Sequence, residues 1–246
     1  MRFIVVDTAD ARGSIAILDE LEVLAIEEHS SEEDYSSWLL PAVHRAFTKS
    51  SLSLAELDGY AICAGPGSFT GLRVGLTTVK AWAELYGKPI AALSRLEALT
   101  ASSSEPGSAP EPALAFVASY IDARRDQIFA ALYARSGSGF EPLGEDSVIS
   151  LPDFVAAVGE KTAGKPVHWV TPDPALLESS PSWTSLAAAG HTLESAPPPF
   201  ALRLGVLACR KFRLRQTTDA LSLDANYVRR CDAEMLWKGN KSAFQA

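Results

Sequence analysis

The segment that decides the fold reads GPGSFTGLRVGLTTVK and occupies residues 65–80. It follows an apolar run at residues 59–64, which is typical of a strand buried on both faces. It leads into a long apolar helix, which we expect over about residues 70–86. A buried strand, a glycine turn and a helix in this order predict an α/β protein whose sheet is mainly parallel.

The residues of this turn have identifiable conformational roles. Gly65 and Gly67 permit backbone angles that residues with a Cβ avoid, and Pro66 stiffens the chain between them. Ser68 or Thr70 is placed to cap the helix. A glycine turn that opens a helix is a general anion site, because free N–H groups converge there. This signal is weak, since many such turns serve as connections and nothing more.

The same segment does not match three more specific motifs. A P-loop needs Lys after its last glycine, but Gly71 is followed by Leu72. A dinucleotide fingerprint needs glycine where Thr70 stands. A hydrolase elbow needs glycine two residues on either side of Ser68, where Pro66 and Thr70 stand instead. Ser68 is therefore a poor candidate for a nucleophile.

The same order of elements occurs twice. A strand ends at Asp7 and at Asp122, and each time a tight turn, two strands, a helix and a further strand are expected. This weak repeat predicts two related lobes, each a mixed sheet flanked by helices, at residues 1–103 and 113–246. The Ser/Pro-rich stretch at residues 104–112 is typical of a linker. Packing of the last segment of the chain against the first lobe stays open.

We expect strands at residues 2–7, 13–18, 21–27, 59–64, 88–93, 114–121, 127–134, 145–149 and 167–170, and helices at residues 31–47, 70–86, after Ser94, 151–158 and 200–215.

Composition limits the function. The chain has 246 residues, 47% of them hydrophobic, and a formal net charge of −8. This acidity argues against a chain that grips nucleic acid alone, and the basic residues Lys211, Arg213, Arg215, Arg229 and Arg230 are interpreted as a solvated helix face. The cysteines Cys63, Cys209 and Cys231 form no zinc or disulfide pattern. No leader or membrane segment is expected, which favours the cytoplasm.

Two helices carry apolar stripes. One is formed by Tyr35, Leu39 and Val43. The other lies on the helix after the glycine turn, where Gly71 and Gly75 are one turn apart and let another backbone approach closely. Two interpretations stay open: a core helix, or a helix that meets another subunit. The residues of the possible partner interface are Tyr35, Leu39, Val43, Gly71, Leu72, Gly75, Leu76, Thr78, Val79 and Trp82.

The sequence also resembles a known family. The run at residues 65–73 is similar to a signature of the TsaB (formerly YeaZ) family. Val5–Thr8, Ile121–Arg124 with Ile128–Phe129, and Asn226–Arg229 resemble three further family elements. The resemblance is strong over residues 1–135, fades over residues 140–195 and returns near the C-terminus. It implies an actin-like (ASKHA) fold of two lobes, paralogous to the catalytic subunit TsaD.

The resemblance implies a non-catalytic scaffold subunit of the complex that adds threonylcarbamoyl to N6 of adenosine 37 in tRNA. In the catalytic relative, the corresponding segment carries two metal-binding histidines. Here Arg95 and Leu99 stand at those positions, and neither is a metal ligand. We therefore expect no metal site. The family often has His at the position of Tyr35, which leaves any role for an imidazole there in doubt.

The implied partners are a TsaD-like catalytic subunit and a TsaE-like ATPase, with a homodimer when the chain is alone and tRNA bound only within the complex. No tightly bound cofactor is expected, although ATP or ADP at the interface with the catalytic partner stays open. Family-motif residues that could remain from a nucleotide pocket are Asp7, Thr8, Gly65, Pro66, Gly67, Ser68, Thr70, Asp122 and Arg124. For Asp7 we favour a simpler role as the cap of the following turn, and for Asp122 a local ion pair with Arg124 is equally open.

Two enzymatic alternatives remain. One is an actin-like small-molecule kinase or ATPase, which lacks support because no glycine-rich adenosine motif occurs late in the chain. The other is a metal-dependent glycoprotease, a label that the wider family has carried. It would need a ligand cluster, yet the four histidines are scattered.

Overall fold

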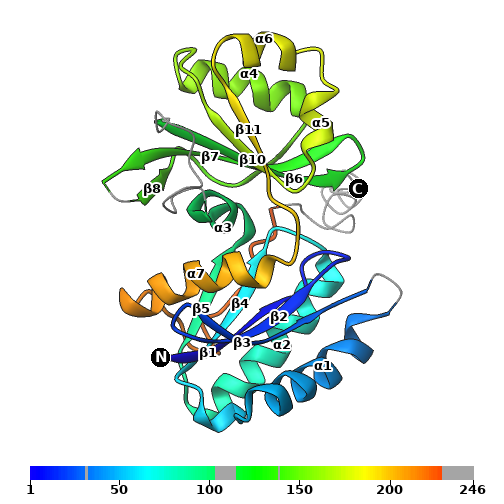
Figure 1. The fold of residues 1–246 in the computed structure, drawn as a ribbon, viewed down its shortest axis with the longest axis vertical. Helices are drawn as coiled ribbons and strands as arrows, with labels where there is room; N and C mark the ends of the chain where they lie inside the picture. The colour runs from blue at the N-terminus through cyan, green and yellow to red at the C-terminus, as the bar shows by residue number, and fades with distance from the viewer. Residues whose placement is uncertain (31–32, 103–114, 138, 229–246) are drawn as a thin grey trace, which may run out of the picture.

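The computed structural model describes residues 1–30, 33–102, 115–137 and 139–228, which form two lobes stacked along the long axis (Figure 1). The first lobe contains a five-stranded sheet with the order β3-β2-β1-β4-β5. β1 pairs with β2 antiparallel and with β4 parallel. The strands are β1 (Arg2–Asp7), β2 (Ser14–Asp19), β3 (Glu22–Glu28), β4 (Gly59–Gly65) and β5 (Ile90–Ser94).

Helices cover both faces of this sheet. α1 and α2 lie on the outer face, and α7 lies on the face toward the second lobe (Figure 1). The central strand β4 carries no charged residue because neither of its faces meets water: all seven of its residues are buried. The elements are α1 (Tyr35–Ser50), the short 3-10 helix η1 (Leu54–Glu56), α2 (Phe69–Tyr86), α3 (Arg95–Ser102) and α7 (Phe200–Arg213).

The second lobe repeats the design. Its sheet has the order β11-β10-β6-β7-β8, with β9 paired to β7. With β6, β7, β8, β10 and β11 in the places of β1 to β5, the order and the pattern of parallel and antiparallel pairs are the same. The elements are β6 (Phe116–Arg124), β7 (Gln127–Ser136), β8 (Gly139–Pro142), β9 (Ser147–Ile149), α4 (Leu151–Lys161), β10 (His168–Thr171), α5 (Pro174–Glu178), α6 (Trp183–Ala188) and β11 (Thr192–Ser195). The predicted repeat and the predicted fold class are confirmed.

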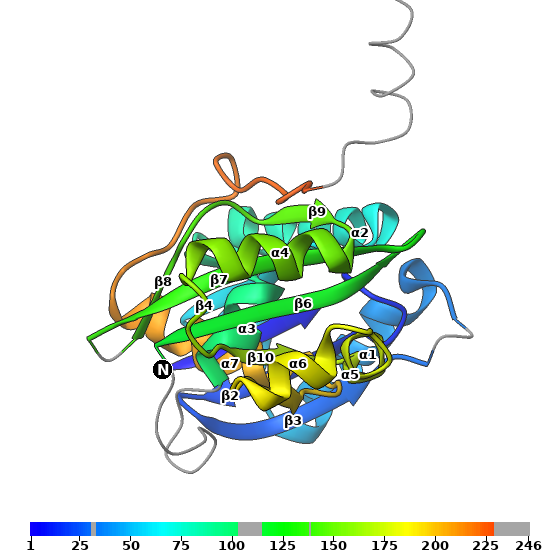
Figure 2. The ribbon, with the colours of Figure 1, turned by 90° about the horizontal axis from the view of Figure 1, so that it is seen from above.

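The two lobes meet through the helices that end each repeat. α3 follows β5 and α7 follows β11, and these two helices pack against each other between the sheets (Figures 1 and 2). α7 comes from the second half of the sequence but covers the first sheet. The segment after α7 also returns to the first lobe, where Ile90 and Thr218 exchange two backbone hydrogen bonds. The predicted linker at residues 104–112 lies outside the described residues.

Candidate functional site

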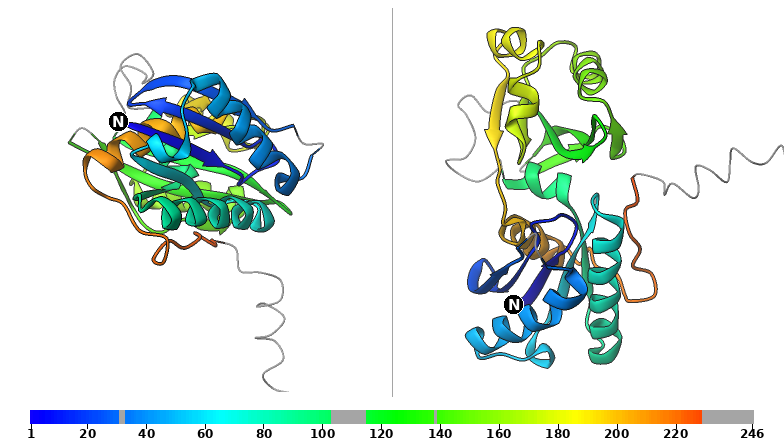
Figure 3. Two further views of the ribbon diagram at one scale, coloured as in Figure 1. Left: turned by 90° about the horizontal axis from the view of Figure 1, so that it is seen from below. Right: turned by 90° about the vertical axis from the view of Figure 1, so that its right-hand side faces the viewer.

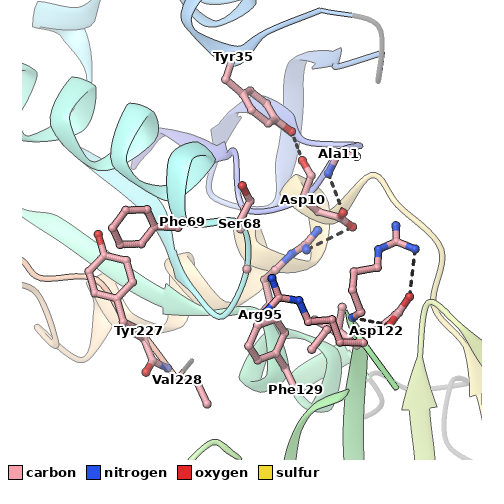
Figure 4. A pocket seen from close by; sticks show the side chains of 17 residues that line it. Asp10, Ala11, Tyr35, Ser68, Phe69, Arg95, Asp122, Phe129, Tyr227 and Val228 are labelled. Carbon is pink, nitrogen blue, oxygen red and sulfur yellow. Dashed lines mark hydrogen bonds and ion pairs between the residues drawn. The ribbon is translucent and has the colours of Figure 1, made fainter. Parts of the chain in front are cut away.

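A pocket of about 700 Å³ lies between the lobes (Figure 4). The β1–β2 turn forms one wall and the β6–β7 turn forms the opposite wall. The first turn of α2, with Ser68 and Phe69, closes a third side together with Tyr35 and Arg95. Residues 226–228 of the returning segment complete the lining. The pocket therefore sits where the two copies of the repeat face each other.

The floor of the pocket is an internal ion pair. Arg95 begins α3 and is only 1% exposed. Its Nη2 lies 3.2 Å from Oδ2 of Asp7, and its Nη1 lies 3.4 Å from Oδ2 of Asp10. The guanidinium also stacks on the ring of Phe200, at 4.3 Å from the centroid. Burial is the largest single influence on the pKa of the Arg95 guanidinium and lowers it, but the neighbouring groups, Asp7 first among them, together outweigh burial, and the pKa is raised.

Asp7 is entirely committed to structure. Its Oδ1 accepts a hydrogen bond of 3.0 Å from the backbone N–H of Ala9, the turn-capping role that the sequence favoured. Its Oδ2 faces Arg95. A buried carboxylate is costly unless it is paired and hydrogen-bonded, and Asp7 meets both conditions. The arginine thus neutralises, from within the chain, the buried charge at the end of the first strand.

The opposite wall is more open. Oδ1 of Asp122 accepts 2.7 Å from the backbone N–H of Arg124, and Oδ2 pairs with Nη1 of Arg124 at 3.2 Å. The side chain of Arg124 is 80% exposed. Three successive residues from Arg124 to Asp126 have positive φ, which non-glycine residues rarely adopt. The ion pair that the sequence left open is therefore present, within a tight and strained turn.

The motif glycines serve the chain itself. A Cβ on Gly71 would collide with the backbone oxygen of Thr8, and a Cβ on Gly75 would collide with the Thr8 hydroxyl. That hydroxyl donates a 2.7 Å hydrogen bond to the carbonyl of Gly71. Ser68 caps α2 by accepting from the N–H of Gly71 at 3.3 Å. The other backbone that these small residues admit is therefore the β1–β2 turn, and not a second subunit.

The predicted interface residues need correction for the same reason. Most of them are buried in this chain's own core, because the apolar stripes of α1 and α2 face the first sheet. The buried ones are Leu39, Val43, Gly71, Leu72, Gly75, Leu76, Val79 and Trp82, while Tyr35 and Thr78 are half-buried. An apolar stripe indicates that one face of a helix is buried, but it does not identify the surface that covers this face.

Tyr35 belongs to the pocket wall. Its hydroxyl accepts 2.7 Å from the N–H of Gly13 and donates to the carbonyl oxygen of Asp10, and its ring stacks on His29 with centroids 4.1 Å apart. Burial raises the pKa of the Tyr35 hydroxyl. His29 thus places an imidazole against the ring of Tyr35.

Several pocket residues were not anticipated. Asn226 and Tyr227 line it from the returning segment, although the resemblance had marked them only as a family element. Asp10 and Arg125 were passed over because nothing in their local sequence separates them from ordinary turn residues.

In the part of the chain that the structure describes, no group of three or more His, Cys, Asp or Glu is placed to hold a metal ion. Leu99 is fully buried. No described helix combines the length and the apolar character required to cross a bilayer.

Two copies of one mixed sheet that face each other across a pocket define the chain as an actin-like (ASKHA) protein of two lobes. A ROK hexokinase from Thermus thermophilus shares this fold, with a TM-score of 0.50 and 12% identity over 85% of this chain and 98% of that one. A Pseudomonas aeruginosa protein described as similar to peptidase YeaZ is closer, with a TM-score of 0.73 and 23% identity over 93% of this chain and 99% of that one.

Sequence comparison identifies the family to which the chain belongs within this fold class. The profile of the family described as TsaD, tRNA N6-adenosine threonylcarbamoyltransferase, matches residues 22–172. The Bacillus subtilis tRNA threonylcarbamoyladenosine biosynthesis protein TsaB is 27% identical over 240 residues, which cover 96% of this chain and 98% of that protein. The chain belongs to this family and, within it, to the TsaB (YeaZ) branch.

Proposed function

We propose that the chain is a non-catalytic subunit of the complex that attaches threonylcarbamoyl to an adenosine of tRNA, and that it works beside a TsaD-like catalytic subunit. One observation carries this proposal. Where the family resemblance implies a metal ligand in the catalytic relatives, this chain buries Arg95 against Asp7 and Asp10. A guanidinium has no lone pair to give a metal, and its charge already satisfies the two carboxylates. The pocket therefore has its own resident cation.

The outer face of α1 and α2 is the proposed docking surface for the catalytic subunit. On α2, Thr77, Ala81 and Leu85 recur every four residues and are exposed, Leu85 by 73%. On α1, Leu40 is 59% exposed. Large apolar side chains beside small ones permit close packing of a partner helix. When the catalytic subunit is missing, the same face is proposed to form a two-fold homodimer.

Other components follow from the same assembly. We place a TsaE-like ATPase as the third subunit, the tRNA in contact with the chain only within the complex, and the whole in the cytoplasm. Any ATP or ADP is placed at the interface with the catalytic subunit. Within the pocket of this chain, Arg95 is already paired with Asp7 and Asp10, and Asp122 is paired with Arg124.

A charged substitution on the docking surface tests the assembly. Arg at Gly75 or Leu76 would disrupt the core, because both residues are buried. Ala81→Arg instead adds bulk and charge to an exposed position of α2. We expect it to reduce co-purification of a TsaD-like subunit at least tenfold. Ala156→Arg, at an exposed position of α4 in the other lobe, is the matched control and should bind normally. Equal binding by both variants would refute this surface.

Reconstitution tests the absence of catalysis. Purified chain with tRNA and the threonylcarbamoyl donor should form no modified adenosine, whereas addition of the TsaD-like and TsaE-like subunits should restore it. Omission of the chain from the full mixture should abolish product. Product formed by the chain alone would contradict the proposal directly.

A further inference from the structure

The segment after α7 runs back across the molecule beside α2 and then turns toward the second lobe (Figures 2 and 3). We call residues 217–228 the strap. Near its start, Thr218 and Ile90 exchange backbone hydrogen bonds of 2.8 and 2.9 Å at the edge of the first sheet. In its middle, Leu223 is 2% exposed and joins the core of the first lobe. The strap is therefore anchored along the first lobe before it reaches the pocket.

At the pocket the strap meets the end of β4. The N–H of Asn226 donates a 2.7 Å hydrogen bond to the carbonyl of Ala64. The next residue, Gly65, has φ of +127°, and a Cβ there would lie 2.7 Å from the carbonyl oxygen of Asn226. Both the backbone angle and the close approach require glycine. The first glycine of the 65–80 motif is therefore matched to a residue 161 positions later in the chain.

The side chain of Asn226 reaches the second lobe. Its Nδ2 donates 2.8 Å to Oδ2 of Asp146, in the connection before β9. The same carboxylate oxygen accepts from Oγ of Ser94, at the end of β5, at 3.3 Å. Asp146 is thus a point where the second lobe, the first sheet and the strap are joined by hydrogen bonds.

The next strap residue holds α2. The hydroxyl of Tyr227 accepts 3.3 Å from Nε of Arg73, and its ring lies 5.2 Å from the ring of Phe69. The guanidinium of Arg73 stacks on Phe69 at 3.8 Å. All three side chains are exposed, so the cluster is held together by stacking and one hydrogen bond and not by burial in the core. Figure 4 shows Phe69 and Tyr227 side by side at the pocket wall.

We propose that the strap is a latch that couples the first turns of α2 to the second lobe. Asn226 and Tyr227 are adjacent in sequence, so a shift of α2 that pulls Tyr227 also moves the amide that holds Asp146. Displacement of either residue removes one of the two hydrogen bonds that Asp146 accepts and so loosens the loop before β9. α2 also carries the proposed docking surface, so a docked catalytic subunit would act on the lobes through this latch. That last consequence rests on the proposed function; the coupling itself does not.

Hydrogen exchange on the isolated full-length chain tests the coupling without any partner. The reporter is the pairing of β9 with β7, next to Asp146, where Ser147 to Ile149 pair with Ile128 to Ala130. Asn226→Asp replaces the donor with a carboxylate that repels Asp146 and should speed reporter exchange at least fivefold. Arg73→Ala acts only at the α2 end and should speed the same amides two- to fivefold, because it removes the hydrogen bond to Tyr227 and the stacking on Phe69 but leaves the Asn226 amide in place.

Leu221→Ala is the matched control, because Leu221 belongs to the strap and is 91% exposed. Its reporter amides should exchange at the wild-type rate. Faster exchange in Asn226→Asp with wild-type exchange in Arg73→Ala would overturn the coupling to α2, leaving a local tie. Wild-type exchange in both would overturn the latch altogether. Neither outcome depends on binding of a TsaD-like subunit, so failure of the latch and failure of the proposed assembly are distinguishable.

Discussion

The β1–β2 and β6–β7 hairpins occupy the same place in the two copies of the fold and face each other across the pocket, yet their aspartates are used differently. Asp7 ends β1, is fully buried and is held by Arg95. Asp122 lies near the end of β6, its side chain is 30% exposed, and its partner Arg124 is mostly in solvent. The repeat supplies an aspartate at both positions, but the surroundings decide whether it supports the fold or only a turn.

The difference follows from what covers each hairpin. The β1–β2 turn is packed against the first turns of α2 and against Arg95, so its polar groups must be satisfied within the chain. The β6–β7 turn forms a wall of the pocket and keeps access to water. The buried charge of Asp7 is therefore a matter of stability, whereas the ion pair of Asp122 with Arg124 lies at the surface of the pocket. The following substitutions test that division.

Removal of Arg95 should have the largest effect. Arg95→Met leaves Asp7 buried without its counter-charge, which we expect to lower the free energy of unfolding by about 3–5 kcal/mol. Asp7→Asn in the same chain should restore a large part of the loss, because the unpaired charge is gone. Urea unfolding of the two single variants and the double variant measures the coupling.

The second hairpin provides the control. Arg124→Met should change the free energy of unfolding by less than about 1 kcal/mol, because exposed ion pairs contribute little. Equal losses from Arg95→Met and Arg124→Met would mean that burial does not separate the two hairpins, and the comparison would fail.

Much of this fold could be predicted from the sequence because its central strands are unambiguous. Runs that end at Asp7 and Asp122 predicted the repeat, and the turn at Ser68 predicted α2 within one residue of its start. Within residues 140–195, the expected strands at 145–149 and 167–170 and the expected helix at 151–158 correspond to β9, β10 and α4. The other elements of this region were missed because they are too short for a period to show. α5 has 5 residues and β11 has 4. The helix expected from residue 31 begins at Tyr35.

The site was less predictable because its contacts join distant residues. Arg95 was identified as a replaced ligand, but its partner Asp7 lies 88 positions away and no local pattern connects them. Asn226 and Asp146 are separated by 80 positions. The stripes on α1 and α2 were recognised correctly as apolar, yet they were assigned to a partner, since periodicity cannot distinguish a chain's own sheet from another subunit.

A second comparison sets α2 in the first lobe against α4 in the second. Gly75→Ala places a methyl group against the Thr8 hydroxyl and within 3.0 Å of Ile62, so we expect a loss of about 1–3 kcal/mol from overpacking. Gly159 lies in α4 with open space around it. Gly159→Ala should stabilise the chain by roughly 0.4–1 kcal/mol, because alanine favours the helix. Thermal unfolding should show a lower unfolding temperature for Gly75→Ala and a higher one for Gly159→Ala. A higher unfolding temperature for Gly75→Ala would contradict close packing of the β1–β2 turn.

The smallest expected effect is on the pH dependence of folding stability, and it again compares the two lobes. Burial raises the pKa of the Asp146 carboxyl above its unfolded value, partly offset by Asn226 and Ser94. Its folded form holds the proton more tightly, so its contribution to stability is present at low pH and is lost as pH rises through the raised pKa. Asp146→Asn removes this contribution and should gain stability over wild type, by under about 1 kcal/mol, as pH rises from 4 to 7.

Asp19 in the first lobe should show the reverse sign. Hydrogen bonds from the terminal amino group and from Arg2 lower the pKa of Asp19, so its contribution is present above the unfolded pKa and is lost as pH falls through the folded one. Asp19→Asn should therefore lose stability relative to wild type as pH rises toward the ordinary pKa of 3.8, and the difference should stay level at higher pH. Urea midpoints at several pH values would give two difference curves of opposite slope. Parallel curves would show that burial at Asp146 does not outweigh its two hydrogen bonds.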